Sequence, residues 1–130
     1  MKRLAFAAMA AFLAAPAAAQ PPPQGWVGEF SASILCDTRE QLQSIVDAFE
    51  EGPVAAEERF QELYRRQNDR SEPTCAVAGV VAVASGTTDL GLIEFGGEMA
   101  YAWIVRIAND AGEGYYLYLE SRTEALKNSI

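Results

Sequence analysis

The stretch ILCDTREQLQSIV, residues 34–46, decides the fold because it changes from a strand pattern to a helix pattern within a few residues. Thr38 and Gln41 fit a capping box, in which the hydroxyl and the amide satisfy backbone groups at a helix start. Apolar residues then recur at positions 42, 45, 46 and 49, so one face of the helix is apolar. We therefore predict that an extended segment over 26–36 leads directly into a helix that packs on the core.

A second helix and a return to strands follow. Gly52-Pro53 ends the first helix, and Pro53 suits the first turn of a second one that reaches about Asn68. Residues 75–84 are apolar on both faces, as in a buried strand. We expect a turn over 85–89 and further strands over 90–95, 98–108 and 115–120. The elements predict an α+β fold, with an antiparallel sheet of about four strands and a helical hairpin packed on one face.

The ends of the chain predict its location and its boundaries. Residues 1–19 are typical of a secretory signal, with Lys2 and Arg3, an apolar run and small residues at a cleavage site. The alternative is a retained anchor, for which the run is shorter than the roughly 18 residues required. We expect a soluble periplasmic or secreted protein without membrane insertion after cleavage. Its parts are a signal (1–19), a proline-rich tether with no apolar side chains to pack (20–25), one domain (26–120) and a tail (121–130).

The cysteines predict one disulfide. The chain has two of them, Cys36 and Cys75, and an even pair in an exported chain favours a bond between them. Closing a loop of this length stabilises a fold by about 4 kcal/mol on the chain-entropy model. The alternatives are free buried thiols or a redox pair, and there is no C-x-x-C motif to lower a thiol pKa.

Composition excludes several chemistries. The chain has no histidine, which removes the usual nucleophile systems and ordinary zinc sites, and we predict neither a metal nor a cofactor. Removing residues 1–19 leaves eight basic against eighteen acidic residues, a formal charge of −10, which repels nucleic acid. Arginines of the second helix stand among glutamates. Because Glu62 precedes Arg66 by four residues, we expect an intrahelical ion pair there.

The candidate ligand-binding residues are Arg106, Tyr116 and Tyr118. In the strand over 98–108 the odd-numbered residues are the larger apolar ones, so that face is the expected core. If Leu117 and Leu119 also face the core, the two tyrosines share the outer face with Arg106. A guanidinium between rings can hold a carboxylate or stack on a flat ligand. The alternative is that the tyrosines only fill a half-exposed strand face.

Two classes of function follow from these residues. The leading hypothesis is a non-catalytic binding or interaction protein, whose partner is a protein or a small molecule. The second hypothesis is a small carboxylate-dependent cell-wall glycoside hydrolase. Its acid and base would come from Asp89, Glu94 and Glu98, which stand close together in the sequence. That chemistry requires two carboxyl groups facing each other, one of them buried.

The order of parts also carries a resemblance. The run over 34–46, a helical stretch and then PTCAVA at residues 73–78 resemble small exported bacterial proteins of unknown function. The resemblance implies a signal, a helix that follows a cysteine, and a second cysteine that opens a sheet. It implies no activity and no site residue.

Overall fold

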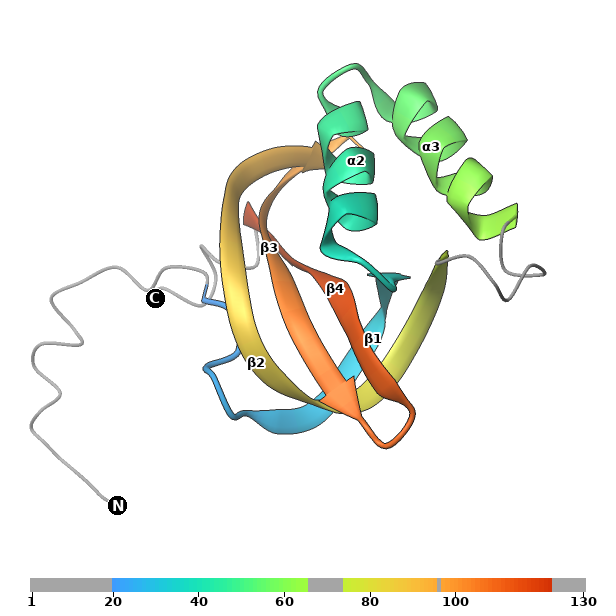
Figure 1. The fold of residues 1–130 in the computed structure, drawn as a ribbon. Coiled ribbons are helices and arrows are strands. Elements are labelled where there is room, and N and C mark those ends of the chain that lie inside the picture. The colour runs from blue at the N-terminus through green and yellow to red at the C-terminus, as the bar shows by residue number, and fades with distance from the viewer. Residues whose placement is uncertain (1–19, 66–73, 96, 123–130) are drawn as a thin grey trace, which may run out of the picture.

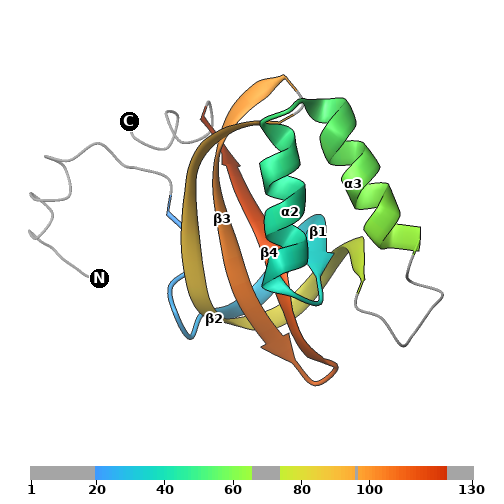
Figure 2. The ribbon, with the colours of Figure 1, turned by 45° about the horizontal axis from the view of Figure 1, so that its top comes forward.

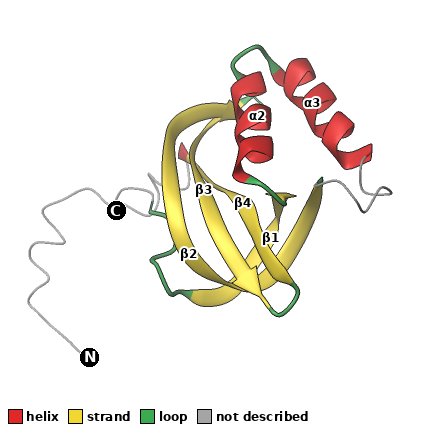
Figure 3. Ribbon diagram, in the orientation of Figure 1, coloured by secondary structure: helices red, strands yellow, loops and turns green. Residues whose placement is uncertain are grey.

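The computed structural model describes residues 20–65, 74–95 and 97–122, so the expected signal lies outside the described residues. In the sequence, one strand precedes the two helices and the other strands follow them. Figure 3 distinguishes the helices from the strands by colour. The elements are β1 (Val27–Cys36), α2 (Arg39–Phe49), α3 (Pro53–Arg65), β2 (Cys75–Phe95), β3 (Glu98–Asn109) and β4 (Gly112–Ser121).

The four strands form one antiparallel sheet that closes on itself in the order β1, β2, β3, β4. Both helices lie on one side of this closed sheet, and the residues that lead into β1 lie on the other side (Figures 1 and 2). The predicted α+β fold with a helical hairpin on a four-stranded sheet is confirmed. None of the helices in the described part of the chain has the length and apolar character to cross a membrane.

The helical hairpin begins where the capping box predicts. Thr38 Oγ1 accepts from the backbone N–H of Gln41 at 3.2 Å, and Gln41 Oε1 accepts from the backbone N–H of Thr38 at 3.3 Å. Pro53 starts α3, as expected from its fixed φ and missing N–H. The expected end of this helix near Asn68 lies outside the described residues.

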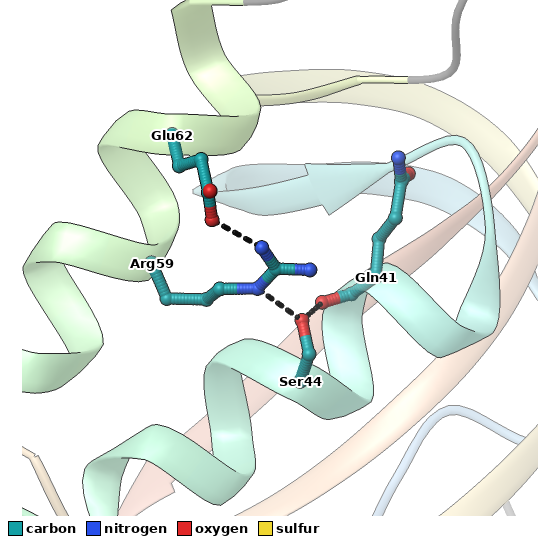
Figure 4. A network of polar contacts seen from close by, with 4 residues as sticks. All are labelled: Gln41, Ser44, Arg59 and Glu62. Atoms are coloured by element: carbon teal, nitrogen blue, oxygen red, sulfur yellow. Dashed lines mark hydrogen bonds and ion pairs between the residues drawn. The ribbon is translucent and has the colours of Figure 1, made fainter.

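A polar network joins the two helices (Figure 4). Arg59 Nε donates to Ser44 Oγ at 2.9 Å, and the Ser44 hydroxyl donates to the backbone oxygen of Gln41 at 2.7 Å. Arg59 also forms an ion pair with Glu62. The partner that we expected for Glu62, Arg66, lies outside the described residues. The network therefore fixes α3 against α2 through the Arg59 side chain.

The turn expected over 85–89 is wrong, because β2 runs through it as one strand of 21 residues. Thr87 and Thr88 pair with Val105 and Ile104 of β3 and continue the ladder. Register shifts after Ala84 and after Asp89 take up the curvature instead of a turn. The bent strand pairs with β1 along its first half and with β3 along its second half, which allows four strands to close.

The two faces of β3 are both buried, which corrects the expectation of one core face and one outer face. One cluster lies inside the closed sheet, and the other lies between the sheet and the helices. The inner cluster comprises Phe30, Ala82, Ala84, Trp103, Val105, Ile107 and Tyr116. The outer cluster includes Leu42, Ile45 and Leu63 of the helices with Ala102, Ile104 and Leu117 of the sheet.

The sheet closes at the end of β1. Cys36 pairs with Cys75 of β2 on one edge and with Tyr115 of β4 on the other. The predicted disulfide joins Cys36 and Cys75 directly across the first edge, with both side chains about 1% exposed. The bond therefore fixes the register at which the chain returns from the helical hairpin to the sheet.

Reduction of the disulfide is expected to lower the free energy of unfolding by about 4 kcal/mol, because the loop that it closes spans 39 positions. Urea unfolding with and without reductant measures the change. A Cys36→Ser/Cys75→Ser double variant is the control, because it has no disulfide to reduce and its unfolding midpoint should be the same with and without reductant. Equal midpoints for reduced and oxidised protein would contradict the expectation.

Candidate ligand-binding site

The structure separates Arg106 from Tyr116 and Tyr118. β3 and β4 are joined by a two-residue turn between Asn109 and Gly112, and this turn sets the register. Tyr116 then pairs with Val105, and Tyr118 pairs with Trp103. The tyrosines therefore face the inside of the closed sheet, whereas the leucines of β4 face the helices. The expectation that the tyrosines share an outer face with Arg106 is wrong.

Arg106 is on the other face of the hairpin and already has a partner. Its register partner is Tyr115, and its Nη2 lies 2.8 Å from Glu113 Oε1 in an exposed ion pair. The hydrogen bond and charge of Glu113 raise the pKa of Arg106. A ligand carboxylate would therefore compete with Glu113 for the guanidinium.

The tyrosines lead instead to an incomplete closure between β1 and β4. Among the described residues, these two strands pair at only two positions, Leu35 with Tyr116 and Cys36 with Tyr115. Beyond them, side chains replace the ladder. Ser33 Oγ donates to the backbone oxygen of Leu117 at 2.7 Å, and the Tyr116 hydroxyl donates to the backbone oxygen of Ser31 at 2.6 Å.

A groove of about 540 Å³ lies where the two strands diverge, and we call it the seam groove. It is lined from three parts of the chain: the leader before β1, the first half of β1 and the second half of β4. The lining residues are Gln20, Pro21, Pro22, Trp26, Glu29, Phe30, Ser31, Ala32, Ser33, Tyr116, Leu117, Tyr118 and Leu119.

Aromatic rings form the inner side of the seam groove. Trp26 meets Phe30 edge-on with ring centroids 5.2 Å apart, and Phe30 meets Tyr116 at 5.0 Å. Tyr118 packs on Trp103 at 5.7 Å. Phe30 and Tyr116 are buried, whereas Trp26 is 38% exposed and Tyr118 is partly exposed. Trp26 and Tyr118 are therefore the rings that a ligand could contact.

The tyrosine hydroxyls of the groove stay protonated at neutral pH. Burial raises the pKa of Tyr116, and the nearby Tyr118 raises it further. Burial also raises the pKa of Tyr118, with a smaller contribution from the negative charge of Glu120. The groove therefore presents neutral rings and one carboxylate, Glu29, which lines its rim.

The position of the Trp26 ring depends on a glycine. A Cβ added at Gly28 would lie 2.3 Å from an atom of the Trp26 ring, so the ring covers Gly28 closely. The next residue on this face cannot carry a side chain without displacing the ring. The sequence pattern places Trp26 at the start of a strand and indicates no role for Gly28.

The leader over 20–25 also differs from the expected tether. The backbone N–H of Trp26 donates to the oxygen of Pro23 at 3.0 Å, and Gly25 has φ of +88°, which is the geometry of a type II turn. Pro21 and Pro22 are partly buried and line the seam groove. The Pro-Gln-Gly-Trp sequence is a signal for this turn that could have identified the fold-back.

The carboxylates considered for hydrolysis do not converge. Asp89, Glu94 and Glu98 are all exposed. Glu94 pairs with Met99, and Glu98 pairs with Phe95, so the two glutamates point to opposite faces of the β2–β3 hairpin. In the part of the chain that the structure describes, no three Cys, Asp or Glu side chains gather in a way that could hold a metal ion.

Comparison of this chain with family models, curated proteins and solved structures found no match. The candidate site therefore rests on the geometry of the seam groove.

Replacing Gly28 by Ala is expected to displace the Trp26 ring with little loss of stability, because the atoms that a Cβ would meet are at the far end of the Trp26 side chain, which is 38% exposed. Of the two tryptophans, Trp103 is 6% exposed, so acrylamide quenching reports mainly on Trp26. Quenching should increase in Gly28→Ala. The matched control is Gly86→Ala in β2, where an added Cβ meets nothing within 4 Å. Identical quenching in both variants would mean that Gly28 does not position the ring.

Proposed function

We propose that this chain is an exported binding protein that acts without catalysis and holds its ligand in the seam groove. Export, to the periplasm or the exterior, is inferred from the signal-like residues 1–19. It is supported by the Cys36–Cys75 disulfide, because such bonds persist in oxidising compartments. The site that supports this proposal is the seam groove. The site expected from Arg106, Tyr116 and Tyr118 together does not form, because Arg106 lies on the opposite face from the two tyrosines.

The observation that carries the proposal is the combination of an opening in the sheet with exposed aromatic side chains along it. Recognition sites are concave, mostly apolar and supplied with a few polar groups that orient the ligand. In the seam groove the apolar surface includes Trp26 and Tyr118 together with the prolines of the leader. Ser31 and Ser33 of β1 are polar lining residues, and Glu29 supplies a negative charge. An uncharged or cationic ligand fits these groups better than an anionic one.

The hydrolase hypothesis receives no comparable support. General acid catalysis by a carboxyl group requires burial that raises its pKa and a second carboxylate across a cleft. Glu94 and Glu98 point to opposite faces of one hairpin, and Asp89 accepts a hydrogen bond from the backbone N–H of Gly91 at 2.7 Å. We therefore carry only the binding function forward.

The Gly28→Ala variant tests this proposal. Immobilised mature chain, incubated with an extract of the host cell envelope, is expected to retain a ligand that mass spectrometry identifies. Gly28→Ala should lower that retention at least about tenfold, because the displaced Trp26 ring removes part of the contact surface. Gly86→Ala and Arg106→Ala should retain the ligand as the wild type does. Loss in Arg106→Ala with full retention in Gly28→Ala would place the ligand on the opposite face and contradict the proposal.

A further inference from the structure

We propose that the ligand of the seam groove is a proline-rich extended segment of a partner polypeptide, and that the chain's own leader, two of whose prolines line the groove, rests against part of the surface that this segment contacts. This inference rests on the proposed binding function and specifies its ligand class. It begins from one observation: the segment that lines the groove beside Trp26 and Tyr118 is itself Gln20-Pro21-Pro22.

The leader is held at the groove by its own backbone. Gly25 donates its N–H to the oxygen of Ala84 at 2.7 Å, and Ala84 donates its N–H to the oxygen of Trp26 at 2.9 Å. These bonds extend the β1–β2 ladder to Gly25, the last residue of the leader. The turn from Pro23 to Trp26 then reverses the chain direction, so that the prolines before it return along the groove instead of leaving the surface.

Burial distinguishes the prolines that line the groove from the one that does not. Pro21 and Pro22 are partly buried, whereas Pro23 is exposed and closes the turn through its carbonyl. A leader that acted only as a spacer would leave all three prolines equally exposed. The difference means that two proline rings rest against the domain at the place where the aromatic side chains are.

The chemistry of the groove suits proline better than a regular strand. Proline has no N–H, so a proline segment cannot complete a β-ladder with the diverging strand edges. A proline-rich chain is already extended, loses little entropy on binding, and packs its rings against aromatic grooves. The seam provides this surface because side-chain hydrogen bonds from Ser33 and Tyr116, and not a ladder, hold β1 and β4 together there.

Because the leader rests against part of this surface, a partner segment has to compete with it. A short segment tethered next to its site has an effective concentration in the millimolar range. A partner segment must therefore bind well enough to displace Pro21 and Pro22, and weakening the leader should expose the groove.

The test uses the full mature chain from Gln20 with Pro21→Ala and Pro22→Ala, which keeps Pro23 and the turn. The probe is a synthetic peptide QPPPQG, with QAAAQG as the matched control peptide. Binding is measured by the shifts of the Trp26 indole and Leu119 amide signals in NMR titrations. The proline peptide should bind the leader variant at least about tenfold more tightly than it binds the wild-type chain, and the alanine peptide should bind neither.

Equal binding of the two peptides, or no binding of the proline peptide to the leader variant, would overturn the inference. Adding Gly28→Ala to the leader variant should weaken binding of the proline peptide, whereas adding Gly86→Ala should not. Equal binding by these two variants would show that the peptide binds outside the seam groove. If the peptide fails while an envelope ligand is still lost in Gly28→Ala, only the proline class is refuted and the binding function stands. If both fail, the seam groove is not a binding site.

Discussion

The rest of the structure depends on the position of Cys36, which has a strand partner on each edge. It pairs with Cys75 through the ladder and the disulfide, and with Tyr115 at the point where β4 meets β1. Because the helical hairpin lies between the two cysteines in the sequence, one covalent bond fixes both the exit to the helices and the return to the sheet. It also fixes which end of the sheet is closed.

The backbone ladder joins β1 and β4 at one end only, and side-chain hydrogen bonds join the two strands beyond it. From Ser33 backwards, β1 bends away from β4, and its register with β2 shifts between Phe30 and Ser33. The hydroxyls of Ser33 and Tyr116 bridge the gap, and the aromatic side chains that line it cannot all be covered by the two strands. The seam groove is thus a consequence of how the sheet is closed, and the leader lines it from outside the two strands.

Short sequence motifs correctly predicted those features that depend only on a few residues and not on the pairing of strands. Thr38 with Gln41 identified the start of α2, and the cysteine pair identified the disulfide. The face of Tyr116 and Tyr118 could not be predicted, because it depends on which two residues form the turn. The expected strands left six residues, 109–114, between them, and the turn is formed by two of these. Alternation also assumes one buried face, which fails for β3, where the helices cover one side and the inner cluster covers the other. The groove was missed for a related reason, since it is formed by segments far apart in the sequence.

The central claim is that β1 and β4 are joined at one end and separate at the other, and amide hydrogen exchange tests it most directly. Tyr115 and Leu119 both point their backbone groups toward β1, because backbone orientation repeats every two residues along a strand and Leu117, which lies two residues from each, accepts from Ser33 through its carbonyl. In the mature chain the Tyr115 amide should exchange orders of magnitude more slowly than the Leu119 amide. Equal protection of the two amides would mean that the ladder continues along the whole of β4, and it would contradict the account.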